Sequence, residues 1–245
     1  MNDKTVLIDS ATILVVRDSE TSGTLEVLMV KRHPDIEFGG GAYVFPGGKV
    51  DAADLELSKS VEFSQSGFGG VAYTAFREVF EESGLILGSA NAPEKYRDSL
   101  LSDQISLREV ITNASVNFDL EHMIPFARWI TPKPYPKRFD TRFFLAKAPQ
   151  GQEASPDFQE IVETTWVNPL EFMENFKEEI MFPTLMNLKL LGQASTVEQA
   201  FEQTRKRKII TIEPKMVNGV RTINADAGYG DIDQTKMHSG FKLDL

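Results

Sequence analysis

The chain contains no cysteine, few histidines and no long uninterrupted run of apolar residues. The missing cysteines exclude a disulfide framework, a thiolate nucleophile and a cysteine-ligated zinc site. His33, His122 and His238 lack a paired ligand spacing, so we interpret each as structural or solvated. No stretch approaches the length of a bilayer-spanning helix, and the first residues lack a basic segment before an apolar run. We therefore expect a soluble protein in the cytoplasm.

Positive charge is also scarce, since the formal net charge at pH 7 is −10. Such a chain offers no counter-charge to nucleic acid or to an anionic membrane surface, and we expect neither as a partner. We interpret the basic run at residues 205–208 as a solvated helix end. A small anionic ligand is compatible with this charge where a metal ion and local arginines receive it.

What the chain does have is a dense group of acids in the segment Arg77–Leu85. On a helix, Glu78, Glu81 and Glu82 fall within an arc of about 100°, while apolar residues occupy the opposite side. We predict an amphipathic helix over about residues 71–83 that lies against the core and holds its acids outward, toward solvent or a ligand. Gly84 is a natural stop for this helix.

Three like charges at this spacing repel one another, and the helix dipole disfavours them near a C-terminus. A hard divalent cation, Mg²⁺ or Mn²⁺, would remove the conflict because it takes oxygen ligands and phosphate oxygens. Arg77 lies four residues before Glu81 and is placed to orient it. The alternative is a solvated glutamate-rich helix face. The upstream segment 44–51 favours the metal site, because its Gly47-Gly48 turn can bring backbone groups close to a ligand.

Together the two segments resemble the signature of the Nudix hydrolase family, which reads Gly, five residues, Glu, seven residues, Arg-Glu, aliphatic, any residue, Glu-Glu, any residue, Gly, aliphatic. Residues 77–85 match its second half, and Gly48 would be its opening glycine. The first half departs, because Asp54 stands where the signature has Glu. Arg77 also follows about fifteen residues later than in an uninterrupted signature, so we interpret about 55–70 as an inserted loop.

A split box of this kind resembles the branch typified by the peroxisomal coenzyme A diphosphatase, Nudix motif nineteen. Stretches at 45–51, 138–144 and 182–184 are similar to that branch, and the resemblance spans roughly residues 5–195. It implies a Nudix-type α/β/α sandwich with a mixed β-sheet. It also implies hydrolysis of the diphosphate bond in coenzyme A or acyl-coenzyme A, giving 3′,5′-ADP and phosphopantetheine.

Other functions stay open. ADP-ribose, NADH or a nucleotide sugar would suit the same chemistry, since residues 31–38 lack a clear coenzyme A signature and Leu243–Leu245 does not resemble a peroxisomal address. A Nudix-like module that binds a nucleotide without cutting it is a hypothesis of another class, although the acids are all present. Cap hydrolysis would need a basic track for RNA, and the acidic chain offers little of one.

The resemblance also implies roles for single residues. Glu78, Glu81 and Glu82, with the Gly47 carbonyl, would hold Mg²⁺ or Mn²⁺, and Arg77 would complete the catalytic set. The first candidate for the base that accepts a proton from water is Glu78, followed by Glu160 and Glu163, for which exposed surface acids are the alternative. The candidates for substrate binding, with surface ion pairs as the alternative for the arginines, are Gly48, Arg32, Arg138 and Arg142.

The remaining pattern favours one elaborated domain over residues 1–207, with a helical insertion at about 92–120, and a C-terminal extension over 208–245. The extension has a candidate hairpin at Asn218-Gly219. Its end, 231–245, is either disordered or covers a partner subunit, so a homodimer stays open. We predict strands at 12–16, 25–30, 43–45, 124–130, 141–146 and 161–167, and helices at 93–112, 170–176 and 184–191.

Overall fold

A computed structural model describes residues 6–59, 67–89, 94–116, 123–133, 135, 137–217 and 220–229. The expectations for the turn at Asn218-Gly219, for the segment 231–245, for His122 and for His238 lie outside the described residues. Within the described ranges, no helix combines the length and the apolar character that crossing a membrane requires.

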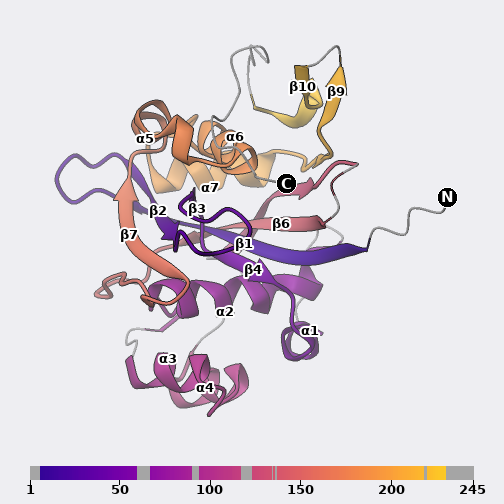
Figure 1. Cartoon of the computed structure of the whole chain (residues 1–245). Helices are drawn as coiled ribbons and strands as arrows, with labels where there is room; N and C mark the ends of the chain where they lie inside the picture. Colours follow the sequence, from indigo (N-terminus) through magenta and orange to yellow (C-terminus); the bar gives the residue numbers. More distant parts are fainter. Residues whose placement is uncertain are drawn as a thin grey trace.

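A mixed β-sheet forms the middle layer of the molecule (Figure 1). Its strands run in the order β3-β2-β1-β6-β5-β8, with β4 paired to β1 and β7 paired to β2. The strands are β1 Leu7–Asp18, β2 Leu25–Arg32, β3 Tyr43–Val44, β4 Gly47–Lys49, β5 Met123–Ile130, β6 Arg138–Lys147, β7 Ile161–Val167 and β8 Thr211–Ile212.

The long strand β1 organises the sheet. Its second half pairs with β2, with Val16 opposite Val27, and its first half pairs with β4, with Ala11 opposite Gly48. Its other edge is hydrogen-bonded in parallel to β6 along ten residue pairs. Because successive side chains alternate between the two faces of a strand, β1 contributes apolar side chains to two hydrophobic cores, one on each face of the sheet. This pairing fixes the Gly47-Gly48 backbone against the middle of the sheet.

Helices cover both faces of the sheet (Figure 1). On one face lie α1 Ala52–Ser58, α2 Ala72–Ser83, α3 Glu94–Leu101 and α4 Leu107–Asn113, and on the other lie α5 Pro169–Asn175, α6 Phe182–Leu191 and α7 Val197–Lys206. Three short 3₁₀ helices are Gly69–Val71, Lys177–Glu179 and Ala225–Ala227. The predicted sandwich with a mixed sheet is confirmed.

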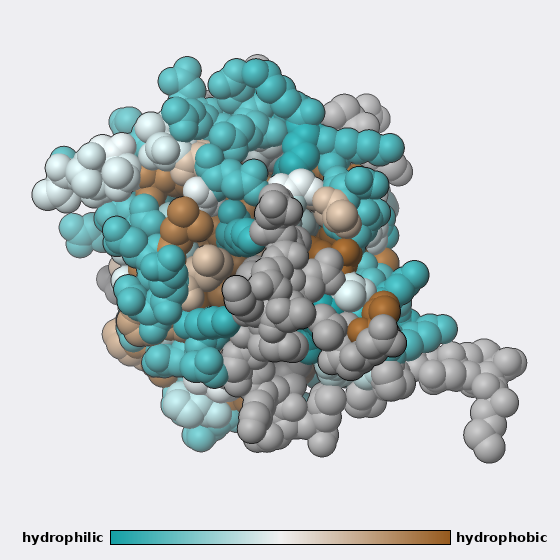
Figure 2. Space-filling view, turned by 90° about the horizontal axis from the view of Figure 1, so that it is seen from above, coloured by the Kyte–Doolittle hydropathy of each residue, from teal (hydrophilic) through white to brown (hydrophobic). Residues whose placement is uncertain are grey.

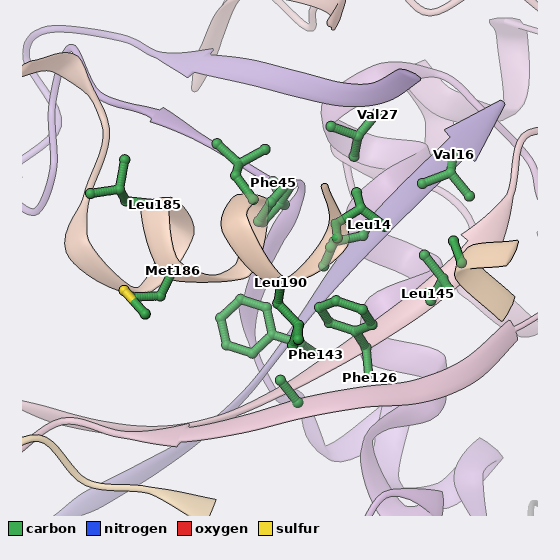
Figure 3. Close-up of a cluster of buried hydrophobic side chains, with 14 of the residues drawn as sticks. Leu14, Val16, Val27, Phe45, Phe126, Phe143, Leu145, Leu185, Met186 and Leu190 are labelled. Carbon is green, nitrogen blue, oxygen red and sulfur yellow. The ribbon is translucent and has the colours of Figure 1, made fainter. Parts of the chain in front are cut away.

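The two faces bury separate apolar clusters. In the upper one, Leu14, Phe143 and Leu145 from the sheet meet Leu185, Met186 and Leu190 from α6 (Figure 3). Helix α6 is apolar nearly all round, which is typical of a helix between a core and a further layer. In the lower cluster α2 contributes Ala75, Phe76 and Val79, all fully buried. This burial fixes the side of α2 that faces the sheet.

Most predicted elements are present, with two differences. The stretch 93–112 forms two helices, because Ser106 accepts a hydrogen bond from the Glu109 N–H and caps a new helix, α4. The predicted loop at 55–70 is partly wrong: α1 continues to Ser58, and a 3₁₀ turn forms at Gly69–Val71. An Asp51–Asp54 capping box explains why α1 begins there.

The beginning of the C-terminal extension is part of the packed fold. Strand β8 pairs in parallel with β5, and Tyr229 is buried, with its hydroxyl accepting from Trp129 Nε1 at 2.9 Å and donating to Asn187 Oδ1 at 3.0 Å. Strands β9 Lys215–Val217 and β10 Val220–Thr222 form the antiparallel pair of the expected hairpin. Seen from above, the described surface on this side is mostly hydrophilic, with small apolar patches (Figure 2).

Candidate active site

Helix α2 presents its acids next to strand β4. Gly84 ends the helix in a left-handed conformation with φ of 73°, and its N–H donates to the Phe80 carbonyl, so the expected helix stop is confirmed. The helix packs on β1 through its apolar side and also contacts β4. The contacts to β4 come from its polar side, where Glu78 and Glu82 lie against the Gly47-Gly48 backbone.

Arg77 is the centre of the acidic group. Its Nη1 lies 2.6 Å from Glu81 Oε2 and 2.9 Å from Glu78 Oε1. Its Nη2 donates to the Lys49 carbonyl at 3.0 Å, which ties α2 to the end of β4. The contact between Arg77 Nη1 and Glu81 Oε2 confirms the expectation that Arg77 is placed to orient Glu81. One guanidinium thus holds two of the three acids and one strand in a fixed arrangement.

The glycines of β4 make room for the other acid contacts. The Gly47 N–H donates to Glu82 Oε2 at 3.0 Å. A Cβ at Gly48 would lie 2.4 Å from Glu78 Oε1, so only glycine lets this carboxylate rest on the strand. The sequence prediction assigned the carbonyl of Gly47 to a metal, and the N–H of the same residue binds the acid Glu82.

Of the two expected surroundings of the acids, solvent or a ligand, exposure to solvent is wrong. The Glu82 residue is 4% exposed, and the side chains of Glu78 and Glu81 are 12% and 18% exposed. Burial raises the pKa of Glu78 to about 8, with Arg77 opposing and Glu81 adding to the shift. Burial also raises the pKa of Glu82 well above its ordinary value, and the charge of Glu78 raises it further. The pKa of Glu81 is raised by burial against the opposing effect of Arg77.

These observations fit a hard divalent cation. Among the described residues, no three acidic or histidine side chains are arranged as metal ligands. The reason is visible: Glu81 points to Arg77 and Glu82 to the Gly47 N–H. Glu78 and Glu81 share Arg77, Glu82 accepts from a backbone N–H, and burial raises the pKa of all three. Carboxylate oxygens of this kind suit Mg²⁺ or Mn²⁺.

Comparisons with known proteins agree with this geometry. The family model described as the NUDT19 Nudix domain matches residues 69–188. The chain is 30% identical over 201 residues to the Caenorhabditis elegans protein named "Putative nudix hydrolase 7", covering 78% of this chain and 64% of that protein. A Nudix hydrolase from Alicyclobacillus acidocaldarius has a crystal structure similar to this fold, with a TM-score of 0.71, 27% identity, and coverage of 81% of this chain and 97% of that chain.

The chain belongs to the Nudix hydrolase family. Within this family, it belongs to the branch of NUDT19. The human acyl-coenzyme A diphosphatase NUDT19 is 26% identical over 214 residues, covering 64% of this chain and 57% of that protein. The chain thus spans less than two thirds of the length of these two relatives.

Asp54 takes the place of the first glutamate in the Nudix signature. It is 1% exposed and accepts from Arg77 Nε at 3.2 and 3.1 Å and from Arg77 Nη2 at 3.0 Å. The Asp51 N–H donates to it at 3.2 Å. Sequence reasoning treated Asp54 only as a departure from the signature. Asp54 is an acid at the position where the signature has Glu, and this could have indicated from the sequence that it anchors Arg77.

Two of the candidate site residues that lie outside α2 and β4 are near the acids. Arg32 and Glu160 both act electrostatically on Glu82, Arg32 lowering and Glu160 raising its pKa. Arg32 Nε is buried without a hydrogen-bond partner among the described residues. The Glu160 carbonyl accepts from the His33 N–H at 2.7 Å, which joins the start of β7 to the end of β2. Glu163 instead has both carboxylate oxygens 3.1 Å from the hydroxyl of Tyr43.

The other two arginines have protein partners. Arg138, 8% exposed, donates to the Thr131 carbonyl and to Glu213, each at 2.8 Å. Arg142 pairs with Asp9 and donates to the Gly67 carbonyl at 3.2 Å. Both arginines are largely buried and are paired with acids of the chain that are partly exposed, and their role toward a substrate stays a prediction.

Sequence reasoning missed Arg97 of α3 entirely. This buried arginine donates from Nε to the Glu81 carbonyl at 2.9 Å and from Nη1 to Ser155 Oγ at 3.2 Å. Its charge lies at the C-terminal end of α2, where the helix dipole favours a cation. The Ser155 N–H also donates to the Ser83 carbonyl at 2.9 Å. No sequence motif marks Arg97, because its role depends on how α3 docks against the end of α2.

Proposed function

We propose that this chain hydrolyses the diphosphate bond of a nucleoside diphosphate linked to another moiety. The supporting observation is the group of buried carboxylates on α2, held by one arginine against a two-glycine strand. Glu78, Glu81 and Glu82 would hold Mg²⁺ or Mn²⁺ in this proposal. Such a cation, when bound, neutralises charge on the diphosphate and lowers the pKa of water.

The chain's own residues would position the reactants. Arg77 fixes Glu78 and Glu81, so that these carboxylates need little reorganisation when substrate binds. Glu78 is the first candidate to accept the proton of the attacking water, because its carboxylate lies at the Gly48 backbone between helix and strand. Glu160 is the second candidate because it acts on Glu82, and Glu163 follows because its carboxylate is held by Tyr43. Arg32 would contact a phosphate with its Nε, which has no hydrogen-bond partner among the described residues.

Coenzyme A or acyl-coenzyme A is the substrate that we place first. The support is the branch, together with the similarity to the human protein NUDT19, which is named an acyl-coenzyme A diphosphatase. The products would be 3′,5′-ADP and phosphopantetheine or its acyl form. ADP-ribose, NADH and a nucleotide sugar are the alternatives, because the acids recognise only the diphosphate.

The test is product analysis by mass spectrometry with Mg²⁺ or Mn²⁺ and a panel of coenzyme A, acetyl-coenzyme A, ADP-ribose, NADH and a nucleotide sugar. Release of 3′,5′-ADP with a preference for the coenzyme A compounds is the expected result. Water enriched in ¹⁸O would label the product whose phosphorus is attacked. AMP from ADP-ribose or NADH would keep the chemistry and reject the coenzyme A substrate. Binding without turnover of any compound would favour the non-catalytic module.

A further inference from the structure

Phe158 has an unusual combination of exposure and backbone conformation. Its residue is 75% exposed, and its φ is 60°, in the left-handed region. The other non-glycine residues with positive φ in the described ranges are Asp103 and Ser115, which are small or polar. A bulky aromatic residue carries a steric penalty in this conformation. Burial does not offset the penalty here, because most of the ring is in solvent.

The turn around Phe158 is held rigidly. Asp157 Oδ1 accepts the N–H groups of Gln159, Glu160 and Ile161 at 2.8, 3.0 and 2.8 Å. The Phe158 N–H donates to the Ile161 carbonyl at 2.9 Å. Ile161 is fully buried at the start of β7. The ring is therefore presented from a preorganised turn rather than from a loose loop.

The same segment is anchored beside the acidic end of α2. Just upstream, Ser155 binds the Ser83 carbonyl, and the Pro156 carbonyl lies 3.4 Å from Arg97 Nη1, whose guanidinium also binds the Glu81 carbonyl. Just downstream, the negative charge of Glu160 raises the pKa of Glu82. The loop between β6 and β7 runs past the end of α2 (Figure 1). Phe158 thus lies at the edge of the candidate active site.

We propose that Phe158 determines substrate specificity by stacking its ring on the base of the nucleoside in the substrate. This proposal rests on the proposed function and adds the part of the substrate that lies beyond the diphosphate. Single exposed apolar residues are common and need no function. A strained aromatic residue in a rigid turn beside the acids does call for one, because asparagine or glycine would occupy the same turn without the penalty.

The experiment compares Phe158→Asn, Phe158→Leu and Phe158→Tyr by steady-state kinetics. The substrates are the best member of the panel and its analogue in which hydrogen replaces the base. Asparagine tolerates the left-handed conformation but has no ring, leucine is apolar without a flat ring, and tyrosine keeps the ring. For the substrate with a base, we expect KM to rise about tenfold or more with Asn and Leu, and to stay within about threefold with Tyr. We expect kcat to change little, because the diphosphate contacts remain.

The abasic analogue separates stacking from a structural effect. Its KM should be the same for wild type and all three variants, and the Tm of Phe158→Asn should equal or exceed that of wild type. An equal rise in KM for both substrates, an unchanged KM for the substrate with a base, or dissociation of a dimer in Phe158→Asn on size-exclusion chromatography would overturn the proposal.

A failure of the proposed hydrolysis can be distinguished from a failure of the proposed stacking by Phe158. A wild-type protein that cleaves no member of the panel would refute the hydrolysis. The stacking would then be decided by calorimetric binding of coenzyme A and ADP-ribose. Affinity lost about tenfold in Phe158→Asn and kept in Phe158→Tyr would support the stacking. Equal affinity of wild type and Phe158→Asn, or no binding at all, would refute it.

Discussion

Two polar clusters lie on the α2 side of the sheet and differ in charge balance. Around Arg77, one guanidinium meets the carboxylates of Asp54, Glu78 and Glu81, and Glu82 accepts a hydrogen bond from the Gly47 N–H. We call this group the acidic cluster. In the second, Arg128 and Arg142 meet Asp9 and Asp140. We call this group the paired cluster.

The difference in charge balance distinguishes the cluster for which we propose a ligand. The paired cluster has as many arginines as aspartates, and Arg128 donates to both oxygens of Asp140, at 2.9 and 2.6 Å. Its hydrogen bonds are satisfied by the chain itself. The acidic cluster has more carboxylates than arginines, and burial raises the pKa values of its glutamates, with neighbouring carboxylates adding to the rise. Buried charge is costly unless it is paired, so the acidic cluster is the one in which we propose that a cation binds.

Removal of the central arginines should separate the two clusters most clearly. In Arg77→Ala the buried Asp54 loses its partner, and we expect a loss of about 3–5 kcal/mol in the free energy of unfolding together with a fall in kcat/KM of about 10²-fold or more. Arg128→Ala is the matched control. Its side chain is 28% exposed, so we expect a loss of about 1–3 kcal/mol and a kcat/KM within about threefold of wild type. Equal activity loss in both variants, by denaturation and kinetics, would contradict the comparison.

Neutralising single acids should have opposite effects in the two clusters. Glu82→Gln and Glu81→Gln should lower kcat by about 10²-fold or more, because each removes a proposed metal ligand. Their stability without metal should be unchanged or higher, since buried negative charge is removed.

The matched control is Asp140→Asn in the paired cluster. It should lower stability by about 1–3 kcal/mol, because Arg128 loses its charged partner, and it should leave kcat nearly unchanged. Wild-type turnover in both glutamate variants, measured with saturating Mg²⁺, would refute the metal assignment.

The acidic cluster should also make the metal-free protein sensitive to pH. The pKa of Glu78 is raised from 4.5 to about 8 in the folded protein. Such a group stabilises the fold below its unfolded pKa, and that contribution is lost as the pH rises through about 8. In EDTA, we expect Tm to fall by about 5 °C between pH 5.5 and pH 8.5.

Two conditions should flatten this dependence of Tm on pH. Mg²⁺ should do so by binding the ionised acids, and Glu78→Gln should do so in EDTA by removing the titrating group. The same slope of Tm with pH in EDTA, in Mg²⁺ and in Glu78→Gln would show that the acidic cluster does not carry the excess charge that we assign to it.

More of the acidic cluster than of the paired cluster could be predicted from the sequence, and the reason is physical. Glu78, Glu81 and Glu82 lie on one helix, so the helical repeat alone places them together. The expectation of exposure to solvent failed because it took account of one helix and not of strand β4, whose glycines let the acids approach the sheet. Helical periodicity gives the direction of a side chain, but burial depends on what packs above it.

The contacts that sequence reasoning missed all join distant segments. Arg142 meets Asp9 and the Gly67 carbonyl, and Arg97 meets the Glu81 carbonyl from a separate helix. Their partners follow from the register of β1 against β6 and from the docking of α3, which no local pattern encodes. The sandwich and most strands were predictable because apolar periodicity is local. The folding of the C-terminal extension around Tyr229 was not, because it depends on Trp129 and Asn187.

The smallest expected effect comes from restoring the glutamate of the signature. Asp54 reaches Arg77 from α1 and also accepts the Asp51 N–H, so its short side chain serves the guanidinium and the helix cap together. Asp54→Glu adds one methylene at a residue that is 1% exposed. We expect a stability loss of about 1–2 kcal/mol from overpacking, and a kcat/KM within about fivefold of wild type, because the charge on Arg77 is kept. Asp54→Asn keeps the size and loses the charge, so a larger activity loss in Asp54→Asn than in Asp54→Glu would show that charge on Arg77, rather than fit, maintains the acidic cluster.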